Sequence, residues 1–72
     1  MKAKRSILGK FEAKIKKSKV IVEFYSHLDD FYVTQTEIDK GDVQSYVMHV
    51  GVSYLIAKAA FHKTVKQFIY LA

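Results

Sequence analysis

Alternating apolar and polar residues predict two strands in the first half of the chain. Residues 19–25, KVIVEFY, are rich in β-branched and aromatic side chains and alternate in polarity, which is typical of a half-buried strand. Residues 31–38, FYVTQTEI, share these features. Between them, residues 26–30, SHLDD, have the composition of a turn. We therefore expect two strands joined by a tight connection.

The segment that precedes these strands fits two structures. As a helix, it has an apolar stripe opposite a lysine stripe; as a strand, Phe11, Ala13 and Ile15 alternate with polar residues. A hairpin loop at residues 17–18 favours the strand, because all three apolar residues then face apolar partners. The pairs are Phe11–Phe24, Ala13–Val22 and Ile15–Val20. This register also sets Lys16 opposite Lys19 and Glu12 opposite Glu23, and the loop lacks glycine, so an amphipathic helix stays the alternative.

Apolar residues recur every three or four positions in the second half, which predicts a helix from residue 43. The stripe comprises Val43, Val47, Val50, Tyr54, Ala57, Phe61, Val65 and Phe68. Asp42 follows the break at residues 39–42, DKGD, and is the expected N-cap. A strand over residues 45–56 is the alternative. We expect a break near His62, after which the tail continues as helix or returns as a strand through Val65, Gln67, Ile69 and Leu71.

The predicted fold class is α+β: a small antiparallel sheet of two or three strands packed against a long C-terminal helix. The 72 residues are interpreted as a single small domain, 1–72, with a lysine-rich N-terminal segment, 1–19. That segment has eight basic residues and one acid, a charge of +7, whereas residues 20–72 have four lysines and six acids, a charge of −2. This asymmetry indicates a polyanionic partner, with a solubilising role for the lysines as the alternative.

Lysines interleaved with tyrosines on a sheet are one means of binding single-stranded nucleic acid, because bases stack on the rings and cations hold the phosphates. The candidate nucleic-acid-binding residues are Lys10, Lys14, Lys16, Lys17, Lys19, Arg5, Tyr25 and Tyr32. The tyrosines would otherwise complete the core or contact a protein partner.

The residue types present do not favour an enzyme. There is no cysteine, the three histidines have no metal-ligand spacing, and no phosphate-binding glycine loop or nucleophile motif occurs. We expect no catalytic residues, metal or cofactor. Residues 43–57 carry no formal charge but are too short for a membrane span, and the first fifteen residues lack a secretory apolar stretch. We expect no membrane partner and a cytoplasmic location.

The order of segments resembles the small antitoxin and inhibitor proteins of T-even bacteriophages, of the TifA-like and Dmd-like kinds. The resemblance covers residues 19–61 and rests on KVIVEFY as a first core strand, a second strand after a polar turn, and DKGDVQ opening a helix that ends in KAAF. It implies a protein that neutralises a host toxin ribonuclease, in the TifA-like case with RNA in the complex. It also implies the cytoplasm of the host cell as the location.

Three hypotheses follow from the sequence. The first is a non-enzymatic inhibitor of a toxin ribonuclease that engages RNA through the lysine-rich segment. The second is a stand-alone RNA- or DNA-binding module, and the third is a membrane-surface protein in which residues 3–17 form a basic amphipathic helix. An exposed strand in so small a sheet also predicts a homodimer or edge pairing with a partner.

Overall fold

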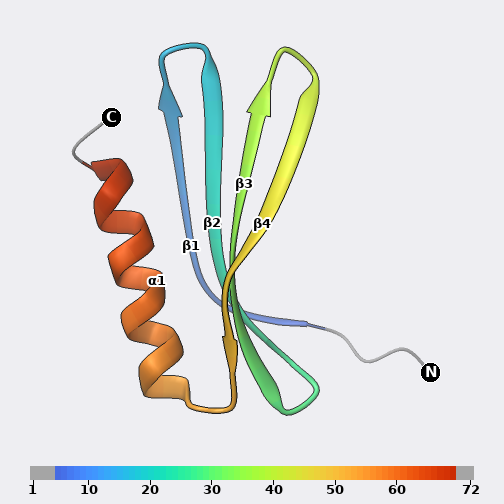
Figure 1. Ribbon diagram of the computed structural model, residues 1–72, viewed down its shortest axis with the longest axis vertical. Coiled ribbons are helices and arrows are strands. Elements are labelled where there is room, and N and C mark those ends of the chain that lie inside the picture. Colours follow the sequence, from blue (N-terminus) through green and yellow to red (C-terminus); the bar gives the residue numbers. More distant parts are fainter. Residues whose placement is uncertain (1–4, 70–72) are drawn as a thin grey trace.

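Four antiparallel strands of equal length are followed by one helix in the computed structural model, which describes residues 5–69 (Figure 1). The elements are β1 (Ser6–Ile15), β2 (Ser18–His27), β3 (Asp30–Asp39), β4 (Asp42–Gly51) and α1 (Tyr54–Ile69). The strands lie in the order β1-β2-β3-β4, so each pairs with its neighbour in the sequence. The predicted α+β class is confirmed, but the sheet has four strands instead of two or three, and α1 has 16 residues.

Two-residue loops connect all four strands. The first loop residue has a positive φ in each case: 57° at Lys16, 57° at Leu28 and 51° at Lys40. Gly41 follows Lys40 with φ 88°, and positive φ at both positions is the geometry of a type I′ turn, which suits the twist of a hairpin. The loops at residues 16–17 and 40–41 lie at the same end of the sheet (Figure 1). We call this end the tip.

The predicted first hairpin is confirmed, but its register was wrong by two residues. The loop is at residues 16–17, and Phe11 faces Val22 instead of Phe24. The residue opposite Phe24 is Gly9, in the same register as the Phe11–Val22 pair, and the extra residue of β1 lies beyond it, between Ile7 and Gly9. A Cβ on Gly9 would lie 3.1 Å from Cε2 of Phe61, so the ring of Phe61 uses the space that glycine leaves beside Phe24.

The charge pairs change with this register. Lys10 faces Glu23 and Lys14 faces Lys19, in place of the expected Lys16–Lys19 and Glu12–Glu23 pairs. A shift of two residues keeps every side chain on the face that the sequence predicted, because side chains alternate with a period of two. The predicted apolar face of the hairpin was therefore correct, although the predicted cross-strand pairs were not.

The predicted helix from residue 43 was wrong over its first part, where the chain forms β4. Asp42 is the first residue of this strand and faces Asp39, so it does not cap a helix. The helix begins after Ser53, whose side-chain Oγ accepts a hydrogen bond from the backbone N–H of Ile56 at 3.3 Å. The alternative of a strand over residues 45–56 was closer to the structure.

The second half of α1 also differs from the expectation. The helix passes through His62 without a break and ends at Ile69, which excludes a returning strand over residues 65–69. The buried Thr64 donates its hydroxyl hydrogen to the carbonyl oxygen of Ala60 at 2.9 Å, one turn earlier, so its hydroxyl is satisfied within the helix. The expected continuation to Leu71 lies outside the described residues.

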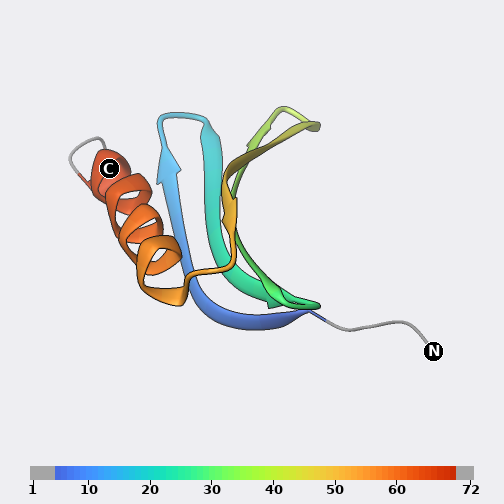
Figure 2. The same cartoon turned by 60° about the horizontal axis from the view of Figure 1, so that its bottom comes forward.

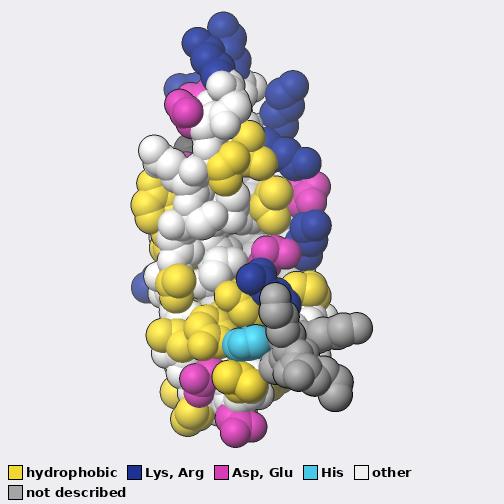
Figure 3. Space-filling model, turned by 90° about the vertical axis from the view of Figure 1, so that its right-hand side faces the viewer, with side chains coloured by type: hydrophobic (Ala, Val, Ile, Leu, Met, Phe, Trp, Pro, Cys, Tyr) yellow, Lys and Arg dark blue, Asp and Glu magenta, His cyan; other side chains and the backbone are white. Residues whose placement is uncertain are grey.

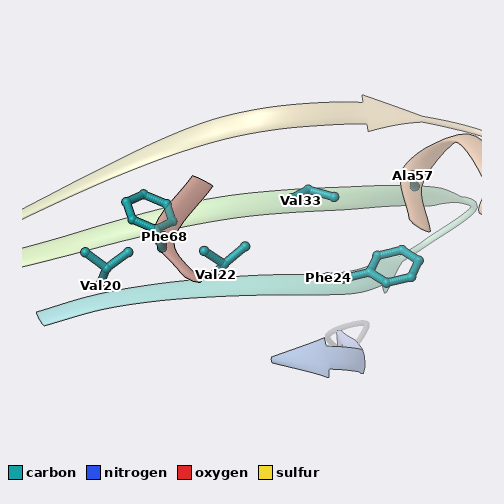
Figure 4. Packing of buried hydrophobic residues seen from close by; sticks show 6 residues of the cluster. All are labelled: Val20, Val22, Phe24, Val33, Ala57 and Phe68. Atoms are coloured by element: carbon teal, nitrogen blue, oxygen red, sulfur yellow. The ribbon is translucent and has the colours of Figure 1, made fainter. Parts of the chain in front are cut away.

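The helix covers one face of the twisted sheet and leaves the other face open (Figure 2). The buried cluster consists of Val20, Val22, Phe24, Val33, Ala57 and Phe68 (Figure 4). Phe24 lies at the end of the cluster near Ala57 (Figure 4), with its ring centroid 5.5 Å from that of Tyr54 and 5.7 Å from that of Phe61. Alternate residues of β2 supply half of this cluster, so their intervening neighbours must point to the open face.

Candidate nucleic-acid interface

The open face is built from the residues that alternate with the core positions of each strand. Four cross-strand rows follow from the register, read in each case from β1 to β4. From the tip they are Lys14-Lys19-Ile38-Val43, Glu12-Ile21-Thr36-Ser45, Lys10-Glu23-Thr34-Val47 and Ile7-Tyr25-Tyr32-Val50. The hydroxyls of Thr36 and Ser45 lie 3.1 Å apart, which agrees with their position in one row.

Four lysines surround a depression at the tip. Lys14, Lys17 and Lys19 come from the first hairpin and Lys40 from the second, and the depression has a volume of about 560 Å³. Glu12, Ala13 and Ile38 complete its lining. We call this site the lysine basin. Its position agrees with the concentration of Lys and Arg side chains at the tip in Figure 3, which views the molecule from the side opposite the helix.

Lys40 was missed as a candidate site residue. It lies between acids in the DKGD turn, where its charge is locally balanced in the sequence. Its place in the basin depends on both hairpin loops lying at one end of the sheet, and an antiparallel meander of four strands brings about this arrangement. The signal that could have placed Lys40 in the basin was therefore the number of strands, which was predicted as two or three instead of four.

Glu12 organises the lysines next to the basin. Its carboxylate lies 3.0 Å from Nζ of Lys10 and 3.6 Å from Nζ of Lys19. The hydrogen bond and the charge of Lys10, followed by the charge of Lys19, lower the pKa of Glu12 below its ordinary value, and Glu12 raises the pKa of Lys10 in return. With Glu23 opposite Lys10, the middle of the open face is nearly balanced in charge. The unbalanced positive charge lies at the tip.

An aromatic stack occupies the opposite end of the open face. The rings of Tyr25 and Tyr32 are stacked, with centroids 5.1 Å apart and an angle of 10° between their planes. The guanidinium carbon of Arg5 lies 4.5 Å from the centroid of Tyr25, a cation–π arrangement. Tyr25 is only 9% exposed, whereas Tyr32 is half-buried, so Tyr32 offers more ring surface to a ligand.

The structure thus divides the eight predicted site residues into separate groups. Lys14, Lys17 and Lys19 meet in the basin, Lys10 is held by Glu12 beside it, and Arg5 joins the two tyrosines at the far end. Lys16 lies apart, because it lines a hollow on the helix side of the sheet together with Ile15, Ser18, Val20, Glu37 and Phe68. The predicted residues do not form one continuous basic surface.

A second surface is uncharged and apolar. It covers β4 and the start of α1, and its exposed large side chains are Val43, Tyr46, Val47, Met48, Val50, Val52, Tyr54, Leu55 and Ile56. Seven of the ten residues of β4 in succession, residues 42–48, are exposed, because α1 covers the strand only near His49 and Gly51. The sequence did not indicate this surface, because a helix from residue 43 would have buried one side of the same residues.

The described residues, 5–69, contain no group of three or more acidic or histidine side chains arranged to hold a metal ion. In that same part of the chain, no helix has the length and apolar character needed to cross a bilayer. Comparison with known proteins gives no match to the chain, whether with family models, curated proteins or solved structures. The likeness to phage inhibitors stays a prediction from the sequence.

Proposed function

We propose that the chain is a small non-enzymatic protein that binds single-stranded RNA, with phosphate groups held in the lysine basin. The observation that carries the proposal is the convergence of four lysines from two hairpins, whose loops are separated in the sequence by β2 and β3. A merely solubilising charge would have no need of such convergence, since scattered lysines serve solubility equally well.

The electrostatics of the basin favour an anionic ligand. Lys14 and Lys19 are directly opposite in the β1–β2 register, where like charges are unfavourable. Within residues 5–69, only Lys19 of the two has an acidic neighbour at ion-pair distance. A phosphate between the lysines would relieve this repulsion and release counterions on binding. The depression is open to solvent, so a phosphate group can reach its lysines.

The aromatic stack extends the proposed path of the RNA. Lys19 and Tyr25 are six residues apart on β2, which corresponds to about 20 Å along the strand. A single strand that enters at the basin and follows the open face would reach Tyr32, on which a base can stack. The balanced middle of the face makes few phosphate contacts in this arrangement, so most of the salt dependence should come from the tip.

Fluorescence anisotropy with a labelled single-stranded RNA tests the proposal. If the four basin lysines each neutralise one phosphate, log K should fall with log salt with a slope of about −3. The triple variant Lys14→Gln, Lys17→Gln, Lys40→Gln should weaken binding and make the slope less steep by about 2. It spares Lys19, whose Nζ lies 3.6 Å from the carboxylate of Glu12.

A matched control variant is available on the helix. Lys58, Lys63 and Lys66 are exposed there, and replacing all three with glutamine makes the same change in net charge. This control should bind RNA nearly as the unmodified chain does. Equal losses in the two triple variants would show that only net charge matters, and the basin would then not be the site.

Within this proposal, the resemblance to phage inhibitors supplies a biological role: neutralising a toxin ribonuclease with RNA in the complex. The observation that favours a protein target is the exposed apolar group Val52, Leu55 and Ile56 at the start of α1, since such groups are typical of protein contacts. Adding the chain to a purified toxin ribonuclease should reduce RNA cleavage. Nuclease treatment during a pull-down then separates a direct protein contact from one bridged by RNA.

A further inference from the structure

The free edge of β4 is unusual for an edge strand. Nine of its ten residues pair with β3 on one side, with Met48 as the extra residue of a bulge, and among the described elements none pairs with the other side. Natural edge strands are commonly protected by charges, especially lysine, or by short length. The opposite edge, β1, has this protection in Lys10, Glu12 and Lys14, whereas residues 43–57 have no charged side chain.

We propose that β4 pairs antiparallel with β4 of a second copy of this chain, which joins two sheets into one of eight strands. The proposed dimer has a two-fold axis perpendicular to the sheet, as antiparallel pairing of identical strands requires. Both helices then lie on one side of the joined sheet, and both lysine basins face the other side. The proposal does not depend on RNA binding.

The register of the proposed β4–β4 pairing follows from the β3–β4 loop and from the bulge in β4. Asp39 and Asp42 flank a two-residue loop and form a hydrogen-bonded pair, so backbone groups of Gln44 and Tyr46 point toward β3. Those of Val43, Ser45 and Val47 therefore point to the free edge. The regular segment ends at residue 47, because β4 has one extra residue before His49.

A two-fold axis at Ser45 uses the whole of this segment. It places Val43 opposite Val47 of the second copy, and Gln44 opposite Tyr46 of the second copy, each pair occurring twice. The Tyr46 hydroxyl already donates a hydrogen bond to Oε1 of Gln44 at 2.6 Å within one chain, so these two side chains are complementary across the axis as well. No charged pair arises in this register.

The uncharged edge is the part of this basic chain where a second copy can approach, and its limited apolar area predicts a weak dimer. Two chains of net charge +5 repel each other, and an uncharged edge allows approach at the lowest electrostatic cost. The exposed large apolar side chains of β4 are Val43, Tyr46, Val47, Met48 and Val50. A small interface of about 600 Å² per partner is about 56% apolar, or roughly 340 Å², so the expected dimer is reversible.

Sedimentation velocity over chain concentrations from about 1 to about 300 µM tests the dimer. The mass should rise with concentration from 8.3 kDa to twice that value. Val47→Lys should hold the chain as a monomer, because it places a lysine on each side of the axis. Leu28→Lys is the control: Leu28 is 75% exposed, against 63% for Val47, it lies in the β2–β3 loop away from the edge, and it makes the same charge change.

Circular dichroism should show both lysine variants folded, since both side chains are largely exposed; if Val47→Lys is unfolded, Val43→Lys takes its place. An unmodified chain that stays monomeric throughout overturns the proposal, as does a dimer that survives the β4 variants. A monomer whose β4 edge instead captures an added partner protein overturns the choice of a second copy.

Disulfide trapping tests the register independently. The chain has no cysteine, so Ser45→Cys introduces a single thiol. Across the axis, a hydrogen-bonded pair has Cα atoms about 5.5 Å apart, within the range that a disulfide spans. Mild oxidation should link Ser45→Cys chains at least tenfold faster than Ser6→Cys chains, in which the same substitution lies on β1, the other edge strand. Equal rates would contradict the Ser45 axis.

Discussion

Replacing Ser53 with alanine should destabilise the fold, whereas replacing Asp42 should not, and the contrast tests where the helix begins. Ser53 accepts a hydrogen bond from the Ile56 N–H at its side-chain oxygen, and its backbone carbonyl accepts one from the Ala57 N–H at 3.1 Å. The first turn of α1 contains no acidic residue, so the Ser53 hydroxyl is the side-chain acceptor available to the free N–H groups there. Its loss leaves the Ile56 N–H to water.

The expected magnitude follows from the geometry of this contact. Loss of an N-cap typically costs about 0.5–2 kcal/mol, and a 3.3 Å bond at an exposed site belongs in the lower part of that range. We therefore expect Ser53→Ala to lower the free energy of unfolding by about 0.5–1 kcal/mol. In a domain of this size, that corresponds to a fall in melting temperature of about 2–8 °C.

Asp42→Ala should change stability by less than about 0.5 kcal/mol, because Asp42 is exposed and faces another acid, Asp39. Ser53→Asp should retain the stability of the unmodified chain, since aspartate caps as well as serine and its charge favours a helix N-terminus.

Urea denaturation followed by circular dichroism measures all three variants. One fixed protein concentration is needed, because self-association would add to the apparent stability. A greater loss of stability in Asp42→Ala than in Ser53→Ala would refute the assignment of β4 and return the helix start to Asp42.

Three further outcomes are expected from the same fold. Phe24→Ala should abolish cooperative unfolding, because truncating a buried phenylalanine costs about 3–5 kcal/mol, comparable with the whole stability of so small a domain; a folded variant by circular dichroism would contradict this. Gly9→Val should lower the urea midpoint, because the Cβ would lie 3.1 Å from the Phe61 ring and the valine methyl groups would need still more space, whereas an unchanged midpoint would show that the ring moves freely. Glu12 has a lowered pKa, so its contribution to stability is present above pH 4.5 and is lost as the pH falls through the lowered value; Glu12→Gln should flatten this acid dependence, and an identical acid limb in both chains would show that the Lys10 pair contributes nothing.

The local sequence pattern was sufficient to predict a strand where one side of that strand is buried. In β2, Val20, Val22 and Phe24 point to the helix while their neighbours point away, so the alternation in the sequence records the two faces directly. β3 follows the same rule through Val33. The predicted core-facing side of β1 was also correct, because Phe11 and Ile15 pack against the core. Its register was not, since the loop sets it, and the chain turns at residues 16–17, where neither lysine carries the glycine or asparagine signal of such a turn.

The candidate site was predictable only in part, because some of its residues are distant from the others in the sequence. The lysines of the first hairpin are close in sequence, so their meeting at the tip follows from one local turn. Lys40 reaches the same basin only because β3 and β4 form a second hairpin that turns at the same end. The stacking of Arg5 on Tyr25 likewise joins residues that are twenty positions apart.

The sequence by itself determined the α+β class, the central strands, the presence of a C-terminal helix and the placement of positive charge near the first turn. Only the tertiary structure decided that residues 42–51 form a strand. Val43, Val47 and Val50 fit a helical spacing, and both faces of β4 are largely exposed, so no buried face imposes a period of two on its residues. The hydrogen bonds that hold β4 come from β3, and a pattern of side chains along one segment does not record a partner across the sheet.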